Sequence, residues 1–399
     1  MIMYLGLLIV FGIFAIGDFL GVFTKARLSS VFVALMTFLV LFLCGAIPKD
    51  LIKMAGLTDL AKMSTPFLVF SMGSSINLVQ MRKEWKVVLM SIIAMLVAIV
   101  SVLAVSPIIG WDSAIVSIPI VNGGIVATQI MTEAALSKNM ALAAALGTLV
   151  FAVQKFVGTI PASYCGLKEA KILVEEYRQK LAEGIDLLKV DEEAETAAAI
   201  KEQKEVKVPF CVKYEKYYTV YMTLGIAAVV CYISSLIGKW TGISTSIWCL
   251  FWGMALNQAG FKPPRILDKG KSQGLFMTAT FCSLIPALAK IELADMGNMA
   301  ISLVLVFGAV LIGCYVLLYL MPLWKIVGSR NMTVGIAMSQ LLGFPATFLI
   351  VNEVATAVAK NEPEKAYIIE KLTPAFVVAG FVSVTTLSII IAGIFTKAL

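Results

Sequence analysis

The chain has 399 residues, of which 60% are hydrophobic and 14% are charged, and its formal net charge is +7. Because soluble domains contain about a quarter charged residues, this composition excludes an ordinary soluble protein and indicates an all-α integral membrane protein. In such a protein a positive net charge reflects lipid contact and topology, so no nucleic-acid partner is expected.

Ten apolar segments of roughly 20 residues are predicted to span the membrane. They form two sets of five, separated by the only long polar stretch in the sequence. The first segment lacks a basic n-region, so we interpret it as a retained span rather than a cleaved signal. The predicted spans are 2–23, 28–47, 63–80, 87–109 and 141–164, followed by 217–238, 243–260, 273–290, 298–322 and 372–396.

The polar stretch at 166–213 contains the acidic run Asp191–Glu195 and predicts a cytoplasmic linker between two transmembrane repeats, 1–165 and 214–399. Part of it is predicted to be an amphipathic helix, because its apolar residues recur at helical spacing. These residues are Leu167, Ala170, Leu173, Val174, Tyr177 and Leu181. We interpret the linker as a solvated tether, and a regulatory or partner-binding role stays open.

Each repeat also contains an apolar segment that is broken in its middle, at 112–137 and at 332–356. The breaks are Asn122-Gly123-Gly124 in the first segment and Gly343 with Pro345 in the second. The arms beside each break are about 10 to 15 residues long, too short to cross a hydrocarbon core of about 30 Å. Both segments are therefore predicted to be re-entrant hairpins, whose irregular backbone must face protein or a watery cavity.

The two broken segments resemble each other. The sequence GIVAT at Gly124–Thr128 matches GFPAT at Gly343–Thr347, and a glutamate follows each, Glu133 and Glu353. We infer an internal duplication, and five spans per copy require the copies to be inverted. Lysine and arginine in the short loops favour both termini outside and a cytoplasmic linker. The two hairpins would then enter from opposite sides and meet near the middle of the membrane.

Inverted repeats with broken helices at mid-membrane are typical of secondary transporters. Half-helix N-termini present free N–H groups to an anion, and glycines let the backbone approach a ligand closely. The alternative, that the glycines serve only close helix packing, stays open. The candidate substrate-binding residues are Asn122, Gly123, Gly124, Thr128, Gln129, Lys155, Gly343, Thr347 and Asn352.

The Asn-Gly-Gly turn at 122–124, the Ala/Thr-rich arm after it and the span ALAAALGTLVFAVQKFVGTIPASY resemble the sodium–glutamate symporters and, more distantly, the 2-hydroxycarboxylate symporters. The resemblance covers the layout of most of the chain, and its specific motif is Gly123-Gly124. It implies two inverted five-helix repeats with glycine-tipped hairpins, a homodimeric scaffold and an elevator motion. The second turn reads Gly343-Phe344-Pro345 in place of Gly-Gly.

Lys155 lies near the middle of its predicted span, where an ionisable group usually faces a cavity or a partner. It could bind a substrate anion, replace a coupling cation, or form a structural salt bridge to Asp18, Glu133 or Glu353. Hydroxyls and carboxylates elsewhere could bind the coupling cation, although hydroxyls on helices can also bond their own backbone. The candidate cation ligands are Ser74, Ser75, Asn77, Thr278, Thr280, Asp18, Glu133 and Glu353.

We expect a cation-coupled secondary transporter, driven by Na⁺, that carries a small organic anion or an amino acid such as glutamate across the plasma (inner) membrane. No cofactor is expected besides the coupling Na⁺. The sequence has no Walker motif, no histidine and no CxxC pair, which argues against ATP drive, a zinc site and an enzyme. The alternatives are a cation–proton antiporter and, from another class, a non-transporting membrane sensor or holin-like protein.

Overall fold

The computed structural model describes residues 2–23, 30–73, 78–185, 187–188, 209–263, 265–343 and 346–399. Within these ranges the secondary structure is helical and no strand occurs, which confirms the predicted all-α class. Five helical stretches in the described ranges are long and apolar enough to cross a membrane, which is consistent with a membrane protein. They are α1 (Ile2–Phe23), α6 (Trp85–Ile109), α9 (Ala141–Ala182), α12 (Val220–Thr241) and the stretch Leu293–Leu320, which contains α17 (Met296–Gly313) and the π-helical turn η3 (Cys314–Leu320).

The other five predicted spans correspond to shorter or interrupted helices, so the count of ten spans stays a prediction. These are α2 (Ser30–Leu43), α4 (Thr58–Gly73), α13 (Thr245–Gln258), the pair α15 (Gln273–Cys282) and α16 (Ile285–Leu288), and a C-terminal series. That series follows α20 (Glu362–Thr373) and consists of η5 (Pro374–Val378), α21 (Ala379–Val382), η6 (Ser383–Leu387) and α22 (Ser388–Phe395). The short helices are α3 (Leu51–Met54), α5 (Leu78–Lys83), α11 (Phe210–Lys213) and α14 (Ile266–Lys269).

Helix α9 is longer than the span predicted at 141–164, because it continues through the first part of the predicted linker to Ala182. The extension buries one face against α20, where the rings of Tyr177 and Tyr367 lie 5.1 Å apart between centroids. Beside them Arg178 donates two hydrogen bonds of 2.8 Å to the carboxylate of Glu364. The apolar periodicity that predicted an amphipathic helix in the linker is therefore used for packing within the chain.

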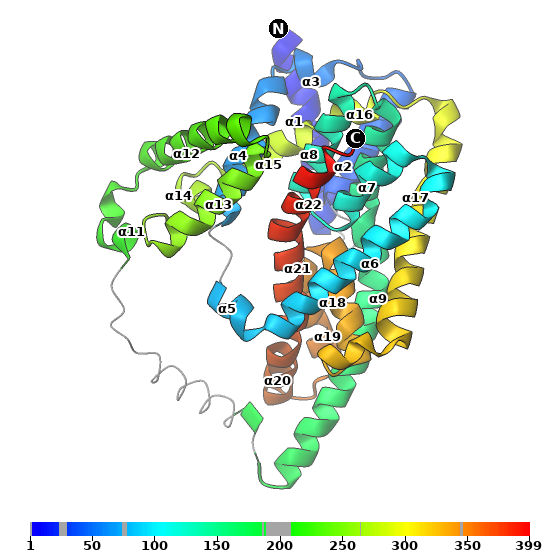
Figure 1. Ribbon diagram of the computed structural model, residues 1–399, viewed down its shortest axis with the longest axis vertical. Helices are drawn as coiled ribbons and strands as arrows, with labels where there is room; N and C mark the ends of the chain where they lie inside the picture. The colour runs from blue at the N-terminus through cyan, green and yellow to red at the C-terminus, as the bar shows by residue number, and fades with distance from the viewer. Residues whose placement is uncertain are drawn as a thin grey trace.

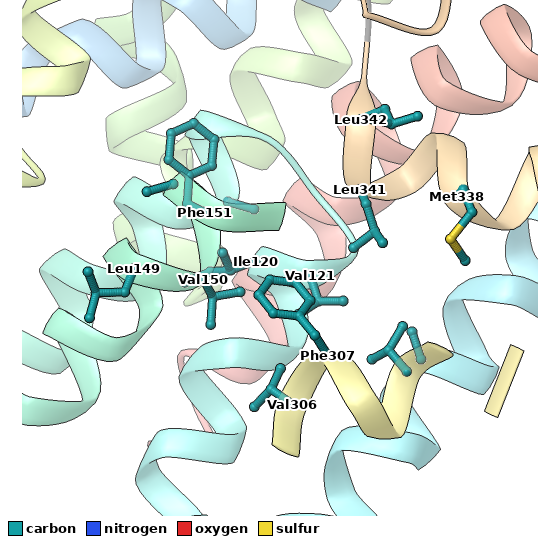
Figure 2. Packing of buried hydrophobic residues seen from close by; sticks show 14 of the residues in the cluster. Ile120, Val121, Leu149, Val150, Phe151, Val306, Phe307, Met338, Leu341 and Leu342 are labelled. Carbon is teal, nitrogen blue, oxygen red and sulfur yellow. The ribbon is translucent and has the colours of Figure 1, made fainter. Parts of the chain in front are cut away.

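The buried apolar residues form a large cluster and a small one. In the large cluster α7 (Trp111–Val121), α9, α17 and α18 (Arg330–Leu342) interlock, as the side chains of Ile120, Phe151, Phe307 and Leu341 illustrate (Figure 2). The residues of the small cluster come mainly from α4, α12, α13 and α14. Val126 and Ile389, which lie on other helices, also belong to it. Helices α11 to α14 lie to one side of the column formed by α9, α17 and α18 (Figure 1).

Candidate functional site

The two broken segments form two helix–turn–helix units with similar arm lengths. In the first unit α7 and α8 (Ile125–Ser137) are joined by the turn Asn122–Gly124. In the second unit α18 is followed by Gly343 and then by α19 (Ala346–Val358). These bounds match the predicted segments 112–137 and 332–356, whereas their entry into a membrane from opposite sides stays a prediction.

The structure brings the two turns together at one side chain, Val384 of η6. A Cβ atom added to Gly124 would lie 2.5 Å from Val384 Cγ1, and one added to Gly343 would lie 3.3 Å from Val384 Cγ2. Gly343 has a φ of +65°, which disfavours any residue with a side chain. A Cβ at Gly123 would lie 2.6 Å from Ser388 Oγ, so packing against α22 alone already requires glycine there.

A cavity of about 440 Å³ opens where the turns meet, and its volume is typical of small-molecule sites. Gly123, Gly124 and Gly343 line it together with Lys155 of α9. Apolar side chains complete the wall, and they include Phe151, Leu341, Leu342 and Phe381. Four of the predicted substrate-binding residues therefore surround one space.

Lys155 and Gln154 bring the polar groups of α9 to this cavity. Within the described residues Lys155 forms no ion pair, so the predicted salt bridge to Asp18, Glu133 or Glu353 is not found there. Gln154 Nε2 donates a hydrogen bond of 3.1 Å to Gly123 O, which ties α9 to the first turn. Gln154 Oε1 is buried without a hydrogen-bond partner and can accept a bond from a bound solute.

Arg265 and Asp268 also line the cavity, and sequence reasoning missed both as site residues. They lie between two predicted spans, where Asp268 belongs to α14 and Arg265 directly precedes that helix. Arg265 has a φ of +48°, a left-handed conformation that is unusual for a residue with a side chain. The sequence gives no periodic signal that would have placed this polar loop at the cavity.

The other predicted substrate-binding residues do not line the cavity. Asn122 is fully buried; its Nδ2 donates to Ile118 O at 2.9 Å, and its Oδ1 has no partner. Thr128 Oγ1 donates to Gly124 O at 3.1 Å, within its own helix. In the second unit, Thr347 is buried with its hydroxyl unpartnered, whereas the half-buried Asn352 donates a hydrogen bond from Nδ2 to Phe348 O of its own helix.

Gln129 joins a buried polar cluster between α4, α8 and α15 instead. Its Nε2 donates to Ala61 O at 2.9 Å and to Glu133 Oε1 at 2.8 Å. Ala61 O also accepts a bond of 2.6 Å from Ser64 Oγ, which lies 2.8 Å from Thr280 Oγ1. Two predicted cation ligands, Glu133 and Thr280, thus belong to one cluster of oxygen atoms.

The remaining predicted cation ligands are not part of this cluster. Asp18 Oδ1 accepts a hydrogen bond of 3.2 Å from Ser30 Oγ at an exposed position. Thr278 Oγ1 donates to Gly274 O of its own helix, and Glu353 is exposed. Ser74, Ser75 and Asn77 lie outside the described residues.

Comparison of the chain with known proteins finds no matching protein-family model and no similar curated protein. The cavity combines the ammonium group of Lys155, the guanidinium group of Arg265, the carboxylate of Asp268 and the free amide oxygen of Gln154. Such a set, enclosed by apolar walls, suits a small polar solute with at least one negative charge.

Proposed function

We propose that the protein is a cation-coupled secondary transporter of a small organic anion or an amino acid. The observation that carries this proposal is the shared cavity, in which two glycine turns from opposite halves of the chain meet beside Lys155. A site between the ends of broken helices can open to either side when one group of helices moves against another. The resemblance to the sodium–glutamate symporters supports the same class.

The proposed substrate carries a carboxylate that binds Lys155. An ammonium group in an apolar surrounding is costly without an anion, and no carboxylate pairs with Lys155 among the described residues. A substrate anion would provide the missing charge. The apolar wall formed by Phe151 and Phe381 would exclude water and favour a solute with a short carbon chain.

The proposed coupling site for Na⁺ is the polar cluster around Glu133. Carboxylate, carbonyl and hydroxyl oxygens can replace the hydration shell of Na⁺, and Glu133, Ala61, Ser64 and Thr280 offer all three kinds. The cluster is linked to the first turn through α8, because α8 begins directly after Gly124 and carries Glu133. Binding of Na⁺ could thus stabilise the first turn in the conformation that accepts substrate.

The larger arrangement is part of the same proposal. Ten spans in two inverted repeats, a homodimeric scaffold and an elevator motion in the plasma membrane would allow the cavity to face each side in turn. The large and the small apolar clusters are two candidate bodies that could move against each other. The cavity lies between them, since its lining residues come from α4, α14 and α15 as well as from α9 and α18.

A cation–proton antiporter is the second candidate, favoured by the single observation that Asp268 lines the cavity. A carboxylate there could exchange a proton for a cation without any organic solute. The test is uptake into proteoliposomes of a panel of radiolabelled organic and amino acids, with Na⁺ and proton gradients imposed separately. We expect Na⁺-dependent uptake of an anionic member. Proton–cation exchange with no solute uptake would favour the antiporter, and no flux of either kind would refute both.

A further inference from the structure

A second cavity, of about 720 Å³, lies between α9, the α17–η3 helix and α18. None of its lining residues lines the cavity at the glycine turns. Its walls are mainly apolar and include Val157, Ile160, Leu311, Val334 and Met338. It opens to the outside of the helix bundle, since the lining residue Ile160 is 75% exposed. We call it the outer groove.

One end of the outer groove carries two cations seated on aromatic rings. Lys168 Nζ lies 4.4 Å from the centroid of the Tyr164 ring, and both residues line the groove. The guanidinium carbon of Arg330 lies 5.6 Å from the ring centroid of Tyr319, another lining residue, and 5.0 Å from that of Trp324. Basic and aromatic side chains are enriched where a membrane protein crosses from hydrocarbon to the headgroup layer.

The positive charge at this end is not neutralised by a carboxylate. Among the described residues neither Lys168 nor Arg330 forms an ion pair. The neighbouring Glu169 is buried, and its Oε2 accepts hydrogen bonds of 2.6 Å from Ser329 Oγ and 3.1 Å from Asn331 Nδ2. The carboxylate of Glu169 is therefore held by neutral donors, and the two cations remain open to an external anion.

We propose that the outer groove binds one anionic phospholipid, with an acyl chain along its apolar wall and the phosphate against Lys168 and Arg330. Basic pockets between membrane helices bind anionic headgroups. The apolar wall distinguishes a lipid from free phosphate, which would gain nothing from Ile160 or Met338. The two cations distinguish an anionic lipid from a neutral one. This inference is independent of the transport proposal.

The same helices connect the outer groove with the cavity at the glycine turns, which we call the turn cavity. Val157 follows Lys155 by two residues on α9, and Met338 lies on α18, which ends directly before Gly343. A lipid between these helices would hold their spacing. Loss of the bound lipid should therefore lower the thermal stability of the purified protein.

The test measures lipid retained by the purified full-length protein in native mass spectrometry, after exchange into vesicles of phosphatidylglycerol or phosphatidylcholine. Each of the variants Lys168→Gln and Arg330→Gln should lower phosphatidylglycerol retention about fivefold, and the double variant about 25-fold, since one basic residue near an anionic headgroup contributes about 1 kcal/mol. Lys171→Gln is the matched control, because Lys171 is exposed on the same helix and does not line the groove. It should retain phosphatidylglycerol unchanged.

A second variant, Ile160→Trp, fills the groove without changing its charge and should also lower retention, while the melting temperature shows that the protein still folds. Equal retention of phosphatidylcholine and phosphatidylglycerol would overturn the proposal, as would an equal loss in Lys171→Gln. Competition by inorganic phosphate as effective as that by the lipid would show an anion site without a lipid, and would also overturn it.

Discussion

The two helix–turn–helix units have related sequences but different surroundings. Helix α8 of the first unit is buried along much of its length and packs against α9 and α22, whereas α19 of the second unit leaves Phe348 and Leu349 more than 40% exposed. Glu133 of α8 therefore belongs to a polar cluster inside the protein, while its counterpart Glu353 is exposed. The two related sequences thus place corresponding carboxylates in different environments, and of the two only Glu133 lies in the polar cluster where we propose that Na⁺ binds.

The turns differ in a similar way. The first turn is tied to α9 through Gln154, and glycine at 123 is required by the nearby Ser388. The second turn depends on the positive φ of Gly343. Both turns lie beside Val384 at the same cavity, so the units converge although their local chemistry differs. Under the proposed duplication the two helix pairs share an origin, and the surrounding helices give each pair a different environment.

The first prediction concerns the sidedness of the two units and has an all-or-none outcome. Cysteine introduced at Lys138, after α8, should react with an impermeant thiol reagent from outside the cell. Cysteine introduced at Lys360, after α19, should react only from inside. Both positions are exposed, so access depends on topology alone. Reaction of both from the same side would refute the inverted repeats.

The second prediction compares the two glutamates. Glu133→Gln should raise the Na⁺ concentration for half-maximal uptake about tenfold, because it removes a partly buried charged ligand. Glu353→Gln, the matched control, should leave it unchanged because that carboxylate is exposed and lies outside the polar cluster. The measurement is uptake against Na⁺ concentration in proteoliposomes. Equal effects of the two changes would show that the difference in burial does not decide cation binding.

The third prediction separates packing from ligand contact at the first turn. Gly124→Ala should lower thermal stability and uptake, because its Cβ would lie 2.5 Å from Val384 Cγ1. In Gly124→Ala with Val384→Ala the steric conflict is relieved, so stability should recover. Uptake should remain reduced about threefold, since one methyl group still enters the cavity. Full recovery of uptake would mean that Gly124 serves packing only.

The fourth prediction uses the ion pair between Arg178 and Glu364, which anchors α20 to α9. The hydrogen bonds from Arg178 lower the pKa of Glu364 to about 2. Because this folded-state pKa lies below that of an unfolded glutamate, the pair stabilises the protein above pH of about 4.5, and the stabilisation is lost as the pH falls towards 2. The melting temperature should therefore depend less on pH over this range in Glu364→Gln than in the original protein.

The control for this experiment is Glu183→Gln at the C-terminal cap of α9, the helix that carries Arg178. Glu183 pairs with Lys180 at 2.8 Å, but both side chains are more than 40% exposed, and such pairs contribute little. Its melting temperature should follow the original protein at every pH. If Glu364→Gln kept the pH dependence of the original protein, the ion pair would not stabilise the fold as predicted.

The helices themselves were largely predictable, because long apolar runs and breaking glycines are local signals. The first predicted span, 2–23, coincides with α1, and the prediction 87–109 differs from α6 by two residues at its start. The length of α9 was not predicted, since the polar residues after 164 resemble a linker. They continue the helix because their apolar face finds a partner in α20.

The site was predictable only in part. Glycine breaks and a lysine in an apolar span are rare enough to single out Gly123, Gly124, Gly343 and Lys155, which line the cavity together. Val384 has no such signal, because it is one apolar residue among many in its span. Likewise Asn122 and Gln129 were predicted from their polarity in the first unit, yet their side chains bond elsewhere. Which of these side chains meet at the cavity is decided by tertiary packing.

The central claim is that the turn cavity binds an anion through Lys155, and Lys155→Gln tests it most directly. Purified protein is titrated with the solute that the uptake panel identifies, and the melting temperature is measured without solute. A lost charge-assisted bond should weaken binding about tenfold to a hundredfold, with Lys155→Arg less affected and the melting temperature nearly unchanged. Unchanged affinity in Lys155→Gln would contradict the account, and weaker binding accompanied by a large fall in melting temperature would assign Lys155 a structural role instead.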